Sequence, residues 1–296
     1  MIARFALSLV FVCFMTCPSP AQSENDGTLR VMSFNVRLGS ANDGEHRWDL
    51  RKELLVETIR GFDPDLLGTQ ETLSFQRDFL EQNLPGYEVL GVGREDGIER
   101  GEMMAVFYRA DRFEQLDAGH FWLSETPDVP GSRSWDTAWT RVVTWVRLRD
   151  RLADGQPELY FFNTHFDNES RQARTEAAKL FWRHIADLEP GANVILTGDF
   201  NTGEETVPYN ALFASREDGA TLLRDVYRVA HPQRSDEEGT FQGFDPTQRT
   251  GARIDWIAAT SGFEVVSADI DHTTRDGRPP SDHFPVTAVL KWTSGE

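Results

Sequence analysis

The chain has 296 residues, and its 48 acidic and 30 basic side chains give a formal net charge of −18 at pH 7. This length is sufficient for one large α/β domain or two small ones. A charge this negative repels polyanions at long range, which disfavours a protein that coats DNA, although a local metal-filled cleft can still bind a phosphate.

Residues 1–21 differ from the rest of the chain in composition. Arg4 is the only charged residue among them, an apolar run covers residues 5–15, and Ser19-Pro20-Ala21 fits a small-x-small cleavage site. This pattern is typical of a secretory signal peptide cleaved near Ala21, so we expect a secreted or periplasmic protein. The apolar run is too short to span a bilayer comfortably, so we expect no stable membrane insertion.

Both cysteines, Cys13 and Cys17, lie in this leader. A lipid anchor on either one is less favoured, because Val12 and Thr16 are not the small residues expected before a lipid-modified cysteine. The mature chain, residues 22–296, would then contain neither a disulfide nor a thiolate. It has no Gly/Ser-rich linker, so we expect one catalytic domain.

Alternating and continuous apolar patterns predict strands along most of the mature chain. In chain order these strands cover Leu29–Arg37, Asp65–Thr69, Tyr87–Gly93, Met103–Arg109, Phe113–Leu123, Thr140–Leu148, Leu159–Phe166, the run from Val194, Ile254–Thr260, Phe263–Asp271 and Phe284–Trp292.

Helical periodicity predicts four helices between these strands. They cover Trp48–Arg60, Leu73–Asn83, Glu169–Leu188 and Pro208–Ser215. About a dozen strands are too many for one layer of sheet beside four helices, so we expect two packed sheets with helices outside.

The stretch Val194-Ile195-Leu196-Thr197-Gly198-Asp199-Phe200-Asn201 is the most informative in the chain. It begins as a short apolar run, which is typical of a strand buried on both faces. A buried strand that ends in polar groups delivers them to the rim of a sheet, where α/β folds place their chemistry.

Polar residues follow the same kind of apolar strand at four other places, and one carboxylate lies inside such a strand. The residues concerned are Asn35, Gln70-Glu71, Asn163 and His165, Asp199 and Asn201, Asp282 and His283, and the internal Asp255. Each has an ordinary structural explanation, such as a helix cap for Glu71 or a turn for Asp282. All of them, however, occur in the same context, an apolar strand with an acid, an amide or an imidazole. It is therefore much less favoured that every one of them has only an ordinary structural explanation.

The ordered set Phe34-Asn35-Val36, Gln70-Glu71, Asn163-Thr164-His165, Gly198-Asp199-Phe200-Asn201, Ile254-Asp255-Trp256-Ile257 and Ser281-Asp282-His283 resembles the endonuclease/exonuclease/phosphatase superfamily. The resemblance covers essentially all of the mature chain. It implies a DNase I-like, four-layer α/β sandwich, with two packed, mostly antiparallel β-sheets flanked by helices.

The resemblance also implies a divalent cation. Glu71 would bind it, helped by Asn35 and at longer range by Asp282. An oxygen-rich set without thiolates suits Mg²⁺ or Mn²⁺.

The catalytic residues implied by the resemblance surround that cation. Asp199 would be the general base and Asn201 would hold the nucleophile or a phosphate oxygen in line. His165 and His283 would donate hydrogen bonds to the developing charge, and Asp255 would orient His283.

Arg141 and Asn163 are expected to contact the substrate, Arg141 by a one-residue match that is equally compatible with a salt bridge. Many nuclease members carry a tyrosine facing the scissile phosphate, but the comparable region here, residues 100–104, has none, and we expect Tyr108 to pack. No extended basic and aromatic run is present to track a polynucleotide.

We therefore expect an exported phosphoesterase, monomeric, acting on a small phosphodiester or phosphomonoester of sugar or inositol type by direct attack of water. An extracellular nuclease is the alternative, followed by a sphingomyelinase-like lipid phosphodiesterase or a non-catalytic binding module. Specificity should lie in loops 94–102, 124–139 and 230–249. Aromatics near these loops, among them Trp122, Trp139 and Phe241, are candidates either for stacking on a sugar or base or for local packing.

Overall fold

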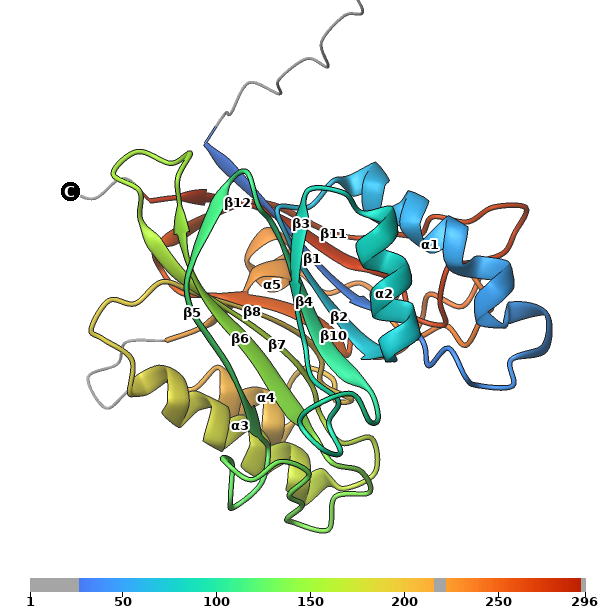
Figure 1. Ribbon diagram of the computed structural model, residues 1–296, viewed down its shortest axis with the longest axis horizontal. Helices are drawn as coiled ribbons and strands as arrows, with labels where there is room; N and C mark the ends of the chain where they lie inside the picture. The colour runs from blue at the N-terminus through green and yellow to red at the C-terminus, as the bar shows by residue number, and fades with distance from the viewer. Residues whose placement is uncertain (1–26, 216–221, 294–296) are drawn as a thin grey trace, which may run out of the picture.

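A computed structural model describes residues 27–215 and 222–293, in which two six-stranded β-sheets pack face to face with helices on both outer sides (Figure 1). This is the four-layer α/β sandwich predicted from the sequence. The predicted signal peptide, residues 1–21, lies outside the described residues. Within those residues, no helix has the length and apolar character needed to cross a membrane.

The first sheet is antiparallel except between β1 and β2, which are parallel. In spatial order its strands are β11 (Phe263–Ile270), β12 (Val286–Trp292), β1 (Thr28–Asn35), β2 (Leu66–Thr72), β4 (Met103–Arg109) and β3 (Tyr87–Leu90).

The second sheet repeats this plan, with one parallel pair, β7 and β8, near its centre. In spatial order its strands are β5 (Phe113–Trp122), β6 (Val142–Asp150), β7 (Glu158–His165), β8 (Val194–Asp199), β10 (Asp255–Ala259) and β9 (Arg224–Asp225).

The helices form the two outer layers. Each long helix buries one apolar face, as its periodicity predicts: Leu55 and Leu80 pack with the first sheet, and Phe181 and Leu212 pack with the second. The first sheet is covered by α1 (Trp48–Phe62) and α2 (Ser74–Asn83), and the second by α3 (Arg171–Ala186) and α4 (Val207–Leu212).

Two further helical segments in the described residues are absent from the four predicted ones: the 3₁₀ turn η1 (Gly44–His46) and α5 (Val226–Ala230). The β-branched and aromatic residues of α5 gave no helical stripe because the helix is little more than one turn long.

The two sheets approach most closely where β2 faces β7 and β8. A Cβ added at Gly68 would lie 2.0 Å from Oγ1 of Thr197, so only glycine fits there. Asn163 spans the same gap: its Nδ2 donates to the carbonyl oxygens of Thr69 and Ala105, and its Oδ1 accepts from Nε2 of Gln70 at 2.7 Å. Buried hydrogen bonds therefore fix the register of one sheet on the other.

Strand register brings the polar strand ends to one edge of the sandwich. Asn35 lies opposite Gln70 in the parallel pair β1–β2, and His165 lies opposite Asp199 in the parallel pair β7–β8. The antiparallel strand β10 begins with Asp255 opposite Asp199. Residues far apart in sequence therefore meet at one end of the molecule.

Candidate active site

A cavity of about 570 Å³ opens at this edge of the sandwich. Seven of the ten site residues predicted from the sequence line it. Those lining it are Glu71, Arg141, His165, Asp199, Asn201, Asp282 and His283, while Asp255 lies behind His283. The remaining two, Asn35 and Asn163, are fully buried.

Glu71 reaches the cavity through an unusual backbone conformation. The pairing of β2 with β4 is interrupted between Thr69 and Thr72, and Glu71 there has φ of 59°. Asn201 (φ 48°) and Arg37 (φ 56°) at the same cavity share this left-handed conformation. Such strain costs about 1–3 kcal/mol per residue and clusters at functional sites.

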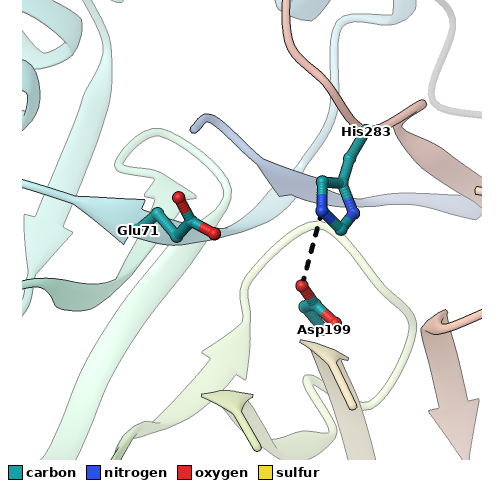
Figure 2. Close-up of side chains that lie close together, drawn as sticks. All are labelled: Glu71, Asp199 and His283. Carbon is teal, nitrogen blue, oxygen red and sulfur yellow. Dashed lines mark ion pairs between the residues drawn. The ribbon is translucent and has the colours of Figure 1, made fainter. Parts of the chain in front are cut away.

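Glu71, Asp199 and His283 form a group in which one ligand atom from each lies within 4.8 Å of the others. Figure 2 shows their side chains pointing toward a common space, with Nε2 of His283 3.7 Å from Oδ2 of Asp199. The carboxylate oxygens of Glu71 and Asp199, on rigid strand ends, are donors that suit a divalent cation such as Mg²⁺ or Mn²⁺. The described residues therefore fit the metal that the sequence implied.

The other two predicted ligands, Asn35 and Asp282, lie beside this group. The Nδ2 atom of Asn35, a donor, faces Oε1 of Glu71 at 3.1 Å and Oδ2 of Asp199 at 2.9 Å, while its Oδ1 accepts from the backbone of Arg37. Asp282 lies 3.5 Å from Nη1 of Arg37. Asn35 thus bridges the two acids by hydrogen bonds, and Asp282 pairs with an arginine.

His283 is held by Asp255, as predicted. Its Nδ1 lies 2.9 Å from Oδ2 of Asp255, and both side chains are almost fully buried. Burial lowers the pKa of His283, but the negative charges of Asp255 and Asp199 outweigh it and hold that pKa well above its usual value. The ring is therefore a charged donor aimed at the cavity through Nε2.

Asp199 is an acid whose pKa is strongly raised by its surroundings. Burial and the neighbouring charge of Asp255 raise its pKa to about 7, against the opposing attraction of His283. A carboxyl group with a pKa near neutrality can accept a proton at the pH at which most enzymes work.

His165 departs from its predicted role as a donor. The Nδ2 atom of Asn201 donates to the carbonyl oxygen of Phe166 and lies 2.9 Å from Nε2 of His165, so this ring nitrogen accepts. Burial, with the charges of Arg141, Arg94 and His283, holds the pKa of His165 well below its usual value. The ring is neutral, and it positions Asn201.

Arg141 lies at the wall of the cavity, where the sequence predicted a substrate contact. Its Nη2 donates to Oδ1 of Asn168 at 3.0 Å, and its Nε lies 3.6 Å from Asp167. Its Nη1 is buried without a hydrogen-bond partner in the described residues. An unpaired buried donor costs about 1–3 kcal/mol, so binding of an anion that accepts a hydrogen bond from this guanidinium would be favourable.

Asn163 is the one predicted site residue that the structure removes from the site. It does not line the cavity, and its amide oxygen and nitrogen are both engaged between the sheets. The substrate contact expected from its place beside His165 is therefore wrong: along β7, side chains two apart share a face, but only the last reaches the rim.

Two charged residues that support the site were missed in the sequence. Arg51 of α1, buried to 4% exposure, donates from Nη1 to the carbonyl oxygens of Val36 and Pro280, which ties the segment after β1 to the segment before His283. Glu102 pairs with Arg94 at 2.7 Å beside His165. In the sequence, the burial of Arg51 could have been inferred only from its position four residues before Leu55, on the same face of the predicted helix.

The chain is similar in sequence and fold to several known proteins. The model of the Endonuclease/Exonuclease/phosphatase family matches residues 32–283. A solved structure titled mannosyl-6-phosphatase Bt3783, from Bacteroides thetaiotaomicron, is 36% identical, with a TM-score of 0.81 over 89% of this chain and 100% of that one. An endonuclease/exonuclease/phosphatase family protein from the same species is also 36% identical, with a TM-score of 0.83 over 90% of this chain and 98% of that one.

Among curated proteins, 2',5'-phosphodiesterase 12 of Mus musculus is 25% identical over 82% of this chain. The match covers 46% of that protein, so the chain spans about half the length of this relative.

Proposed function

Because the chain belongs to the endonuclease/exonuclease/phosphatase family, whose members hydrolyse phosphoesters, we propose that it is a Mg²⁺- or Mn²⁺-dependent phosphatase acting on a sugar phosphomonoester. The observation that carries the proposal is the convergence of Glu71, Asp199 and His283 in one cavity. The substrate class is supported by a neighbour titled mannosyl-6-phosphatase at 36% identity over nearly the whole chain.

In the proposed reaction, Glu71 is the principal residue that holds the cation. When bound, a divalent cation polarises a phosphoryl oxygen and offsets its negative charge. Asp199 takes a proton from water as the water oxygen attacks phosphorus, and the bond from phosphorus to the sugar oxygen breaks. The proton taken by Asp199 passes through solvent to that sugar oxygen, which restores the carboxylate, and inorganic phosphate and a free sugar are released.

The remaining residues position these groups. His283 donates from Nε2 to a phosphoryl oxygen, and Arg141 offers its unpaired Nη1 to another. Asn201 receives its orientation from His165 and the carbonyl of Phe166, which supports a role in aligning the attacking water.

A panel of substrates tests the proposal. EDTA-treated protein is supplied with Mg²⁺ or Mn²⁺ and given mannose 6-phosphate, bis(nitrophenyl) phosphate and single-stranded DNA. We expect metal-dependent release of phosphate from mannose 6-phosphate at the highest kcat/KM. The proposal fails if mannose 6-phosphate and other sugar monophosphates are not hydrolysed with either metal.

A phosphodiesterase is the second candidate, favoured by the mouse relative that is named a 2',5'-phosphodiesterase. The net charge of −18 opposes binding of a polyanion. Faster cleavage of the diester or of DNA than of the sugar phosphate in the same panel would reverse the order of the two candidates.

We also propose that the chain is exported and acts as a monomer. The pattern of residues 1–21 supports export. Cell fractionation with N-terminal sequencing should find a mature chain beginning just after Ala21, and light scattering should give the mass of one chain. A cytoplasmic chain that keeps its first residues would contradict export.

A further inference from the structure

The mouth of the cavity carries two exposed aromatic side chains. Three aromatics are among the large hydrophobic side chains that stay exposed in the described residues: Phe75, Trp139 and Phe241. Of these, Trp139 (53% exposed) and Phe241 (51% exposed) line the cavity. Phe241 packs edge-on against His283, with ring centroids 5.1 Å apart, whereas Trp139 stacks on no other aromatic ring within residues 27–215 and 222–293. The surface of Trp139 is thus left open toward the cavity.

The backbone that carries Trp139 is fixed by a buried carboxylate. Asp167, 2% exposed and just after β7, accepts through Oδ2 from Oγ1 of Thr137 at 2.7 Å and from the backbone nitrogen of Ala138 at 3.0 Å. Its Oδ1 accepts from the backbone nitrogens of Glu169 and Ser170. One carboxylate therefore joins the loop of Trp139 to the strand end that carries His165.

The loop is held at other points as well. Oγ of Ser170 donates to the carbonyl of Trp135 at 2.8 Å, and Nη2 of Arg133 donates to the carbonyl of Ala138 at 2.8 Å. Trp135 adopts φ of 58°, a conformation that only surrounding contacts can maintain. An exposed tryptophan on a loop so constrained cannot fold inward to bury its ring, and that preorganisation lowers the entropic cost of binding.

A cation covers one side of the ring. The guanidinium carbon of Arg94 lies 5.7 Å from the ring centroid of Trp139, and Arg94 is itself fixed by Glu102. The guanidinium of Arg94 therefore lies over one face of the Trp139 ring, while about half of the surface of Trp139 remains exposed. A flat, rigid, half-exposed surface of this kind favours a ligand that is flat and apolar on one face.

The charges of the cavity favour a neutral group beyond the phosphate. Five carboxylates line the cavity (Glu71, Glu95, Glu102, Asp199 and Asp282) against three guanidiniums (Arg37, Arg94 and Arg141). Arg37 pairs with Asp43 and Asp282, and Arg94 pairs with Glu102, which leaves Nη1 of Arg141, unpaired in the described residues, and Nε2 of His283 for one phosphate. A second phosphate would meet uncompensated acids, whereas sugar hydroxyls can donate to them.

We propose that Trp139 is the platform on which the sugar ring of the substrate stacks, and that Asp167 sets its position through Thr137. This inference rests on the proposed function. In this arrangement the hexose ring packs one face of C–H groups against the indole of Trp139. Its hydroxyl groups then remain free to donate hydrogen bonds to the carboxylates that line the cavity. Trp139 is then the residue that distinguishes a phosphorylated ring from any other phosphomonoester.

The test compares a substrate with a ring to one without. Phosphate release is measured from mannose 6-phosphate and from glycerol 3-phosphate, and the ratio of the two kcat/KM values is taken for each variant. We expect Trp139→Ala to lower this ratio about tenfold, and Trp139→Phe to retain most of it. Val129→Ala, an exposed residue on the same loop that does not line the cavity, is the matched control and should leave the ratio unchanged.

Thr137→Val tests the positioning role of Asp167 without altering the partner of Arg141. The valine keeps the shape of threonine but removes the hydroxyl that binds Asp167. We expect the ratio of the two kcat/KM values to fall several-fold because KM for mannose 6-phosphate rises. The thermal midpoint should stay well above the assay temperature, so that the variant remains folded.

The outcomes separate the two proposals. If the wild type hydrolyses neither monoester, the proposed function fails. If it hydrolyses both but Trp139→Ala lowers the two kcat/KM values by the same factor, or lowers neither, the platform is overturned while the phosphatase stands. If Trp139→Ala acts only on a nucleoside monophosphate added to the panel, the sugar assignment is overturned in favour of a base.

Discussion

Nδ1 of His283 lies 2.9 Å from a carboxylate oxygen of Asp255, and the exposed fractions of the two residues are 5% and 0%. Asp255 is the first residue of β10, between the apolar Ile254 and Trp256, where an unpaired carboxylate would be costly. The contact explains why an acid occupies that position: it keeps a buried imidazole protonated and oriented.

The pH dependence of the reaction tests this pair. The raised pKa of His283 means that its charged form persists as the pH rises, and activity is lost once the pH passes that pKa. Asp255→Asn removes the larger of the two raising charges, so the alkaline limb of the profile of kcat should move to lower pH, and kcat should fall by about 10- to 100-fold. An unchanged limb would show that the charge of Asp255 does not act through His283.

Turnover tests the roles of the residues that face the cavity. Asp199→Asn removes the proposed base and His283→Ala removes the proposed donor, so each should lower kcat by about 10²-fold or more. Phe75→Ala is a control, because Phe75 is exposed but does not line the cavity. Rates near that of the wild type in both variants would remove the mechanism.

The raised pKa of Asp199 predicts that the site costs stability when no metal is present. The pKa of this carboxyl group is higher in the folded state than in the unfolded state. The group therefore destabilises the fold increasingly as the pH rises from the ordinary pKa of an aspartate to about 7. In EDTA, Asp199→Asn should therefore raise the thermal midpoint at pH 8 and raise it less at pH 5. Equal midpoints for variant and wild type at pH 8 would contradict the cost assigned to this carboxylate.

Asn163 provides a test of a structural role. Asn163→Ala removes the hydrogen bonds to the carbonyl oxygens of Thr69 and Ala105 and from Nε2 of Gln70, and a buried polar group left unpaired costs about 1–3 kcal/mol. The free energy of unfolding in urea should fall accordingly, while KM for the sugar phosphate should stay the same in protein that remains folded. A raised KM with unchanged stability would restore Asn163 to the binding site.

The fold and the set of polar strand ends could be predicted from the sequence because both are local patterns. Apolar runs mark the strands, and the register of parallel pairs then brings residues such as Asn35 and Asp199 to one edge. The predicted helix Trp48–Arg60 matches α1, but the apolar side chain of Leu50 in its first turn is 49% exposed. Arg51 occupies the buried face in its place.

What could not be predicted depends on backbone conformation and on contacts between distant segments. The left-handed φ of Glu71 directs its carboxylate into the cavity, yet no residue preference foretells it, since glutamate rarely adopts this region. The direction of the Asn35 amide, the neutral state of His165 and the position of Asn163 between sheets each depend on partners 35 or more residues away.

Binding of Mn²⁺, followed by electron paramagnetic resonance on metal-stripped protein, tests most directly whether these residues form one cation-dependent centre. We predict saturable Mn²⁺ binding that Mg²⁺ displaces, with a Kd at least about tenfold weaker in Glu71→Gln. Equal affinity in the wild type and in Glu71→Gln, or no binding by the wild type, would contradict the account.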